Sequence, residues 1–149
     1  MMIIRRYTPD DCAELAALFY NTVHTVNAKN YSKEQLNAWA DGNIDLKEWN
    51  RSFLQHYSIV AVKDDIITGF GDIDTAAGYL DRLFVHAGYQ GRGIGSAICE
   101  RLERAVQGKI IVHASITARS FFEQRGYRLL KKQQVERHGI WLENFVMEK

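Results

Sequence analysis

The pattern best suited to a chemical task is the run GYQGRGIG at residues 88–95. An apolar, strand-like run (residues 79–85) precedes it, and a helix-like run (residues 94–106) follows. Glycines leave backbone N–H groups accessible, and a helix start adds unpaired donors and the positive end of the helix dipole. We therefore expect a phosphate or pyrophosphate site. An ordinary tight turn is the alternative, but three glycines at alternate positions cost conformational entropy that a plain turn does not require.

Three kinds of phosphate loop compete for this run. A Walker loop needs a lysine followed by Ser or Thr after its last glycine, whereas Ser96 and Ala97 follow Gly95 here. A dinucleotide fingerprint begun at Gly91 meets Ser96 where Gly or Ala is required. The third pattern, Gln/Arg-x-x-Gly-x-Gly/Ala, fits residues 90–95 at every fixed position.

That third pattern resembles the pyrophosphate loop of the GNAT N-acetyltransferase superfamily, which binds acetyl-coenzyme A. Residues 83–97, LFVHAGYQGRGIGSA, resemble the central motif of the family along its whole length. Residues 115–127 resemble its later helix and following strand, and residues 3–11 resemble its first strand and helix entry. The resemblance is good over residues 58–149. Three further segments are similar to a YafP-like branch, namely residues 38–40, 134–139 and 144–147.

The resemblance implies an acetyltransferase that uses acetyl-CoA as co-substrate and needs no metal. It implies transfer to a primary amine of a small molecule or protein, by direct attack in a ternary complex. In the family two strands splay apart, and the pantetheine arm pairs with the first, here through Leu83 and Val85. The implied coenzyme-binding residues are Leu83, Phe84, Val85, Gln90, Gly91, Arg92, Gly93, Ile94, Gly95, Ser96, Ser115, Ala118 and Phe122.

Two of these positions have a second interpretation. Arg92 can pair with a phosphate or can be a solvated loop charge. Ser115, where the family often has Asn, can bond the coenzyme or merely cap a helix.

Acetyl transfer to an amine needs a general base. An alkyl ammonium has a pKa near 10.4, so deprotonation at pH 7 costs about 4–5 kcal/mol. Asp81 is the first candidate, because a carboxylate in an apolar strand demands a partner. Strand alternation predicts that it shares a face with Tyr79, Leu83 and Val85. A structural ion pair is an equal alternative for Asp81. Asp72 and Asp74 on the preceding strand are alternative bases; they are expected to form an exposed edge or a turn more often, and they can still attract a cationic amine.

The general acid departs from the family pattern. The usual tyrosine of the later helix falls on Phe122, so that role cannot be carried over. Tyr127 and Tyr79 are substitutes by proximity in the sequence, although such tyrosines are more often core residues. Water is the remaining proton donor. The backbone N–H of Val85 is the candidate for holding the oxyanion.

The acceptor site is expected between the N-terminal helices and the final hairpin. Tyr31, Trp39 and Trp49 fall there, and at least one should line the acceptor cleft. The candidate acceptor-binding residues are Tyr31, Trp39, Asp72 and Tyr79.

Length and composition limit the number of domains and the kinds of partner that we expect. With 149 residues we expect one acetyltransferase domain, residues 1–149. The net charge of +1, without a basic run, argues against nucleic acid. There is no metal-type Cys/His spacing, and Cys12 and Cys99 are expected to pack as small apolar side chains. No signal peptide or membrane span is expected, which makes the cytoplasm the default, and a monomer or a homodimer is open.

The order of the predicted elements indicates a mixed α/β (α+β) fold. It has a central, mostly antiparallel sheet, helices on both faces and one parallel strand–helix–strand crossover. The crossover joins the strands predicted at residues 79–85 and 109–113. Local signals place helix starts at Thr8, Ser32 and Asp45, and hairpin turns at residues 64–65 and 138–139.

Two rival functions remain open. A coenzyme-A-binding sensor or interaction module with little catalysis would explain Phe122. An acyltransferase that uses another acyl-CoA would keep the same phosphate loop.

Overall fold

One seven-stranded sheet organises the chain, and the computed structural model describes all of residues 1–149. The strands are β1 (Met2–Arg6), β2 (Tyr57–Lys63), β3 (Ile66–Asp74), β4 (Tyr79–Val85), β5 (Ile111–Ser115), β6 (Arg128–Arg137) and β7 (Ile140–Glu148). The helices are α1 (Cys12–Thr25), α2 (Lys33–Trp39), α3 (Leu46–Gln55), α4 (Ile94–Arg104) and α5 (Arg119–Gln124). Short 3-10 turns are η1 (Pro9–Asp11), η2 (Asn27–Lys29) and η3 (Ala87–Tyr89).

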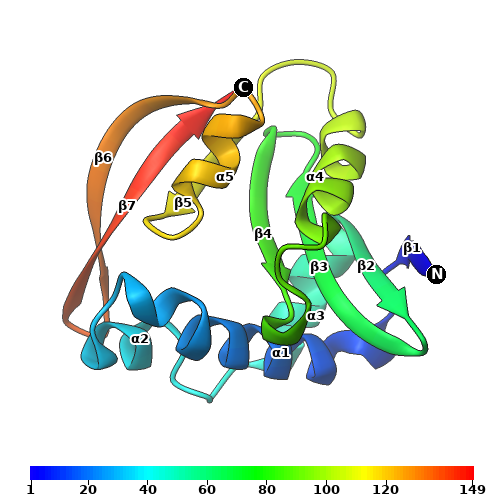
Figure 1. The fold of residues 1–149 in the computed structure, drawn as a ribbon, viewed down its shortest axis with the longest axis horizontal. Coiled ribbons are helices and arrows are strands. Elements are labelled where there is room, and N and C mark those ends of the chain that lie inside the picture. The colour runs from blue at the N-terminus through cyan, green and yellow to red at the C-terminus, as the bar shows by residue number, and fades with distance from the viewer.

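The strand order is β1-β2-β3-β4-β5-β7-β6, and every neighbouring pair is antiparallel except β4 and β5. Helix α4 makes the crossover between these two parallel strands, so the predicted mixed fold is confirmed. β4 and β5 share only two register pairs, Tyr79 with Ile111 and Leu80 with Val112. Beyond Leu80 the two strands diverge, and the sheet opens into two halves that Figure 1 shows on either side of the molecule.

Helices cover both faces of the sheet, each over its own core. On one face, Ile98 and Leu102 of α4 and Phe122 of α5 pack with Leu80 and Met147. On the other face, α1, α2 and α3 contribute buried residues that include Leu15, Leu36 and Phe53, which pack with Phe70 and Leu142. We call these the α4–α5 side and the α1–α3 side of the sheet.

Two strand glycines set how closely α4 approaches the sheet. A Cβ added to Gly69 would lie 3.0 Å from Ile98, and one added to Gly71 would lie 2.9 Å from Leu102. Because β3 offers no side chain there, α4 packs directly on its backbone. This close packing fixes where the helix begins and therefore where the glycine-rich turn lies.

The local signals predict both hairpins and the helix starts at Ser32 and Asp45 correctly. Thr8 instead caps the 3-10 turn η1, and α1 begins after it at Cys12. Ser32 forms the expected capping box with Gln35, and Asp45 accepts hydrogen bonds from the first turn of α3. Asp64 and Asp65 close the β2–β3 hairpin with φ of 51° and 65°. The strand expected at residues 109–113 lies two residues later, as β5, because Ile110 instead exchanges backbone hydrogen bonds with Lys149.

Both cysteines are buried and free, as expected of small apolar residues. None of the helices has the length and apolar character that a membrane crossing requires.

Candidate active site

A cavity of about 450 Å³ occupies the wedge where β4 and β5 diverge. It is lined by the end of α1, by β4, by the glycine-rich turn with the start of α4, and by the region from the end of β5 into α5. The lining residues are Thr22, Val26, Asn27, Leu83, Phe84, Val85, Tyr89, Gln90, Gly91, Gly93, Ile94, Gly95, Ser96, Ser115, Thr117, Ala118, Phe121 and Phe122.

The glycine-rich turn forms one end of this cavity. Gly91 and Gly93 have φ of 72° and 79°, the left-handed conformation that side chains with a Cβ rarely adopt. Gly93 is the N-cap of α4, and its carbonyl accepts the first helical hydrogen bond from Ala97. The N–H groups of the first helical turn therefore have no partner within the helix and lie at the cavity. An anion bound there meets both these donors and the helix dipole.

The exposed edge of β4 forms one wall. The N–H of His86 donates to the carbonyl of Thr68 over 2.8 Å, which makes residues 68 and 86 a hydrogen-bonded pair of the antiparallel ladder. Since hydrogen-bonded and non-hydrogen-bonded pairs alternate, Leu83 and Val85 direct their N–H and C=O groups away from β3, into the wedge. The carbonyl of Val85 already accepts from Thr22 Oγ1 (3.1 Å) and Gln90 Nε2 (2.7 Å).

The remaining β4 groups in the wedge are the N–H groups of Leu83 and Val85 and the carbonyl of Leu83. No strand pairs with them, because the β4–β5 register ends at Leu80. An extended chain of amides can therefore be added to β4 at this edge.

Twelve of the thirteen predicted coenzyme-binding residues line the cavity, and Arg92 does not. The Arg92 guanidinium instead lies over the ring of Tyr89, 5.0 Å from its centroid. Sequence reasoning missed the contribution of the end of α1 and the start of η2, where Thr22, Val26 and Asn27 close the other wall. Their spacing on a helix carried no signal beyond that of a packed face.

Asp81 does not share a face with Leu83 and Val85, so that prediction is wrong. The register of β3 and β4 shifts between Asp72–Arg82 and Ile73–Leu80, which makes Asp81 the extra residue of a β-bulge. Leu80, Leu83 and Val85 all pack on the α4–α5 side. Asp81 lies on the α1–α3 side, directly after the last β4–β5 pair and thus at the vertex of the wedge.

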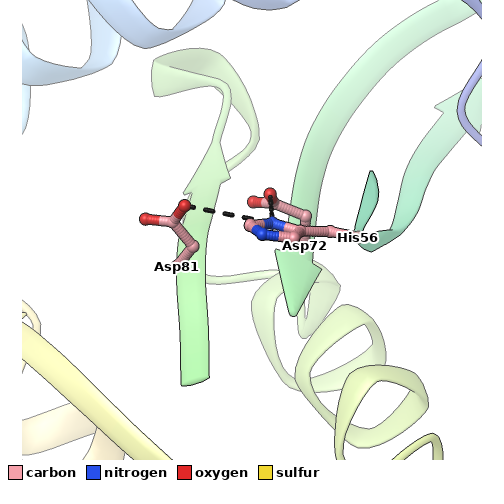
Figure 2. Close-up of side chains that lie close together, drawn as sticks. All are labelled: His56, Asp72 and Asp81. Atoms are coloured by element: carbon pink, nitrogen blue, oxygen red, sulfur yellow. Dashed lines mark hydrogen bonds and ion pairs between the residues drawn. The ribbon is translucent and has the colours of Figure 1, made fainter. Parts of the chain in front are cut away.

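The Asp81 carboxylate lies within reach of two basic groups. Its Oδ2 is 3.7 Å from Arg82 Nη2 and 4.0 Å from His56 Nδ1, and the Asp81 side chain is 30% exposed. Figure 2 shows Asp81 pointing from β4 toward the His56 ring. The structural ion pair weighed for Asp81 is therefore present, but at distances longer than a hydrogen bond.

Asp72 is fully buried and is not free to bind an acceptor, contrary to expectation. Its Oδ2 accepts hydrogen bonds from His56 Nδ1 (2.7 Å) and Arg82 Nη1 (2.6 Å), while Oδ1 is buried without a partner. Burial raises the pKa of Asp72 against the pull of these two donors. The hydrogen bond to Asp72 raises the pKa of His56.

Polar atoms of His56, Asp72 and Asp81 lie within 4.8 Å of one another, a spacing that metal ligands share. The Arg82 guanidinium, however, bonds Asp72 and lies over the rings of Trp49 and Phe53. It already supplies the positive charge that these carboxylates require, and a metal ion would be repelled by it. The cluster suits an arginine better than a metal.

Tyr127 is not at the cavity, so its position does not suit the general acid expected of it. It is buried, its hydroxyl donates to Glu103 Oε2 over 2.8 Å, and burial raises its pKa. Tyr79, the other candidate, is half-buried, and its ring meets that of His113 edge-to-face at 5.2 Å. Both rings lie on the α1–α3 side, because Leu80 and Val112, their strand neighbours, face the other core.

Tyr31 and Trp39 line a second, smaller cavity of about 50 Å³ on the α1–α3 side. The Tyr31 hydroxyl donates to the carbonyl of Glu143 (2.6 Å) and accepts from the N–H of Ile116 (2.9 Å). Ser115 lines this cavity as well as the larger one, and its hydroxyl accepts from the N–H of Ala118. Ser115 therefore caps the turn before α5 and also lines the cavity, so the structure agrees with both interpretations.

Two histidines near Asp81 were not predicted as site residues from the sequence. His56 lies between α3 and β2, and His113 faces Tyr79 across the wedge vertex. Burial lowers the pKa of His113, and the charges of Lys131 and Arg137 lower it further. The one signal for His113 in the sequence is its place between the apolar residues Val112 and Ala114. Both are buried, so His113 points to the opposite face of the strand.

The fold and the cavity define a class of protein. A wedge between diverging parallel strands, with a glycine-rich helix start at one end and a free strand edge along its wall, accommodates a long phosphorylated coenzyme. Comparison with known proteins identifies the class as acyltransferases: residues 27–149 match the model of the acetyltransferase (GNAT) domain, and the chain belongs to this family.

Individual relatives and solved structures are consistent with this family assignment. The chain is 37% identical over 144 residues to the uncharacterized N-acetyltransferase YafP of Escherichia coli K12, covering 97% of this chain and 93% of that protein. The crystal structure of a GCN5-related N-acetyltransferase from Rhodopseudomonas palustris superposes with a TM-score of 0.93 at 30% identity, covering 99% and 94%. The PaiA N-acetyltransferase of Thermoplasma acidophilum, crystallised with coenzyme A, shares the fold at 17% identity with a TM-score of 0.80, covering 100% and 98%.

Proposed function

We propose that this protein transfers the acetyl group of acetyl-CoA to a primary amine by direct attack in a ternary complex. The observation that carries the proposal is the cavity of about 450 Å³, which joins the start of α4 to the unpaired edge of β4. Similar folds have been crystallised with coenzyme A, in the Thermoplasma protein, and with acetyl-CoA, in YncA of Salmonella typhimurium.

The coenzyme has a natural orientation in this cavity. The pyrophosphate binds the N–H groups of residues 91–96, where the helix dipole favours negative charge. The pantetheine amides pair with the free groups of Leu83 and Val85 in the manner of an added strand. This arrangement brings the thioester toward the vertex of the wedge, where Asp81 lies.

Asp81 is the proposed general base. Removing the proton of an alkyl ammonium costs about 4–5 kcal/mol at pH 7, and a positioned carboxylate lowers this cost directly or through one water. The free amine then attacks the thioester carbon. Because the thioester lies beyond Leu83, the free N–H of Leu83, rather than the N–H of Val85 expected from the sequence, holds the developing oxyanion. Collapse of this intermediate breaks the C–S bond and releases the coenzyme thiolate, and the excess proton on the attacking nitrogen passes to water.

No side chain is needed to protonate that thiolate. Phe122 lines the cavity without a proton to give, and the Tyr127 hydroxyl is occupied by Glu103. A thiol has a pKa of roughly 8.5, so the thiolate is a good leaving group and water can supply the proton.

A thermal melt with acetyl-CoA, CoA, NAD or ATP added separately tests the donor. A ligand at about 100 times its dissociation constant stabilises the fold by ~2.7 kcal/mol. A rise in Tm with the two coenzyme A species alone supports the proposal, and a larger rise with NAD or ATP contradicts it. Release of free thiol with a panel of amines then separates an enzyme from a coenzyme-binding module, which would bind without turnover.

A further inference from the structure

The α1–α3 side of the sheet near the wedge vertex carries side chains from three further strands. Leu142 packs in the α1–α3 core, so the even-numbered residues of β7, including Asn144 and Val146, face this side. Directly paired residues share a face, which places His113 of β5 and Lys131 of β6 beside Val146. By the same register Arg137 lies beside Ile140, on the same side.

Two of these side chains are cations without an ionic partner. Lys131 and Arg137 form no salt bridge, and the one hydrogen bond of the Arg137 guanidinium goes to the carbonyl of neighbouring Glu136. Lys132 offers the contrast, because it points to the opposite side and lies 3.8 Å from Glu143. Lys132 therefore has a carboxylate partner, whereas Lys131 and Arg137 have none.

Charges of opposite sign flank the Tyr79–His113 ring pair. Asp81 follows Leu80, the last β4 residue paired with β5, and His113 follows its partner Val112, so both lie at the vertex. Arg137 lines the small cavity together with Ser115, two residues beyond His113. On the Asp81 side the other charges are mutually paired: Arg82 and His56 both bond Asp72. The region thus has an anionic end at Asp81 of β4 and a cationic end at Lys131 and Arg137 of β6.

The cationic end also has a recess for a small polar group. Arg137, Tyr31, Ser115 and Asn144 line the cavity of about 50 Å³, which has room for only a few atoms. Asn144 Oδ1 is buried there without a partner, and a half-turn of the amide presents its two N–H donors instead. Ser115 connects this recess with the large cavity.

We propose that the acceptor is a free amino acid, bound with its ammonium group at Asp81 and its carboxylate at Arg137. A zwitterion matches both ends of the region, and the planar guanidinium suits a carboxylate. A diamine would place a second positive charge against Arg137 and Lys131, and a protein N-terminus carries no carboxylate near its amine. This inference rests on the proposed function and adds the substrate class.

Matched pairs of acceptors test it: lysine against cadaverine, and phenylalanine against phenethylamine. Each pair differs by one carboxylate, and kcat/KM is measured by thiol release from acetyl-CoA. We expect at least a tenfold preference for the amino acid in one pair. Arg137→Gln should abolish the preference by raising KM for the amino acid alone, and Arg137→Lys should retain part of it. Lys132→Gln, next to Lys131 but on the other side, is the matched control and should leave the preference unchanged.

Equal or better kcat/KM for the decarboxylated amines overturns the inference, as does an unchanged preference in Arg137→Gln. These outcomes are distinct from a failure of the proposed function, which would appear as no response to acetyl-CoA in the thermal melt. If acetyl-CoA binds but no pair turns over, calorimetric titration of the CoA complex with the same pairs decides. Binding of the amino acid and not the amine supports the inference, and any other result contradicts it.

Discussion

At the scale of single residues, Asp81 carries the chemistry proposed here. Asp81→Asn removes the base while keeping the size of the side chain, so we expect kcat to fall by about 10²–10⁴-fold. The affinity for acetyl-CoA should stay the same, because Asp81 does not line the coenzyme cavity. Steady-state kinetics and a binding titration measure the two effects separately.

Asp74→Asn is the matched control, since Asp74 holds the turn after β3 through the N–H groups of Ala76 and Ala77. The Asp74→Asn variant should keep the kcat of the unmodified protein. A full rate in Asp81→Asn would show that another group, such as His113, accepts the proton.

His56 makes folding stability depend on pH. The hydrogen bond to Asp72 raises its pKa in the folded protein, so the folded state binds this proton more tightly than the unfolded state. The resulting stabilisation is complete below the unfolded value of about 6.5 and is lost as the pH rises through the folded-state pKa. His56→Gln should therefore cost more stability at pH 6 than at pH 9.

Urea unfolding of the unmodified protein and of His56→Gln, at pH 6 and at pH 9, measures how this loss of stability depends on pH. His113, whose pKa is lowered, has the opposite sign of linkage, but it is present in both proteins and cancels in the difference. A cost of His56→Gln that is the same at both pH values would contradict the ion pair with Asp72.

At the scale of elements, the start of α4 is the most exacting feature. Gly93 has φ of 79°, and a Cβ there meets no protein atom within 4 Å. Gly93→Val should strain the backbone by about 1–2 kcal/mol and obstruct the bound pyrophosphate. We expect acetyl-CoA affinity to fall at least tenfold, as measured by calorimetry.

Gly139→Val is an unusually close control. Gly139 has the same φ of 79° and equally open surroundings, but it lies in the β6–β7 turn. It should lose similar stability and keep its acetyl-CoA affinity. If both variants lost affinity equally, general destabilisation rather than the phosphate site would be the cause.

At the scale of the whole molecule, two register pairs join the halves of the sheet. A coenzyme in the wedge would bridge β4 to α5, so we expect hydrogen exchange of the Leu83 and Val85 amides to slow when acetyl-CoA binds. Phe84, between them, faces β3 in a hydrogen-bonded pair with Phe70, and its amide should change little. Residue-resolved exchange by NMR tests this alternation. Equal slowing at all three residues would indicate general stabilisation and contradict strand-like pairing.

The sequence predicted much of this organisation because its signals are local. Ser32 and Asp45 cap helices through hydrogen bonds to residues two or three positions away. The turns at Asp64–Asp65 and His138–Gly139 have positive φ, which these residue types tolerate. Each such feature depends on a few neighbouring residues, so a short stretch of sequence suffices to recognise it.

By itself, then, the sequence determined the glycine-rich turn, the crossover and twelve of the residues that line the large cavity. Only the tertiary structure decided which side of the sheet each reactive group faces. The bulge at Asp81 arises from the pairing of β3 with β4, and it reverses the alternation from which the face of Asp81 was predicted. Asp72 and Tyr127 are buried, and each is bonded to partners that lie 10–24 residues away in the chain. Such pairings depend on distances in space that no local pattern records.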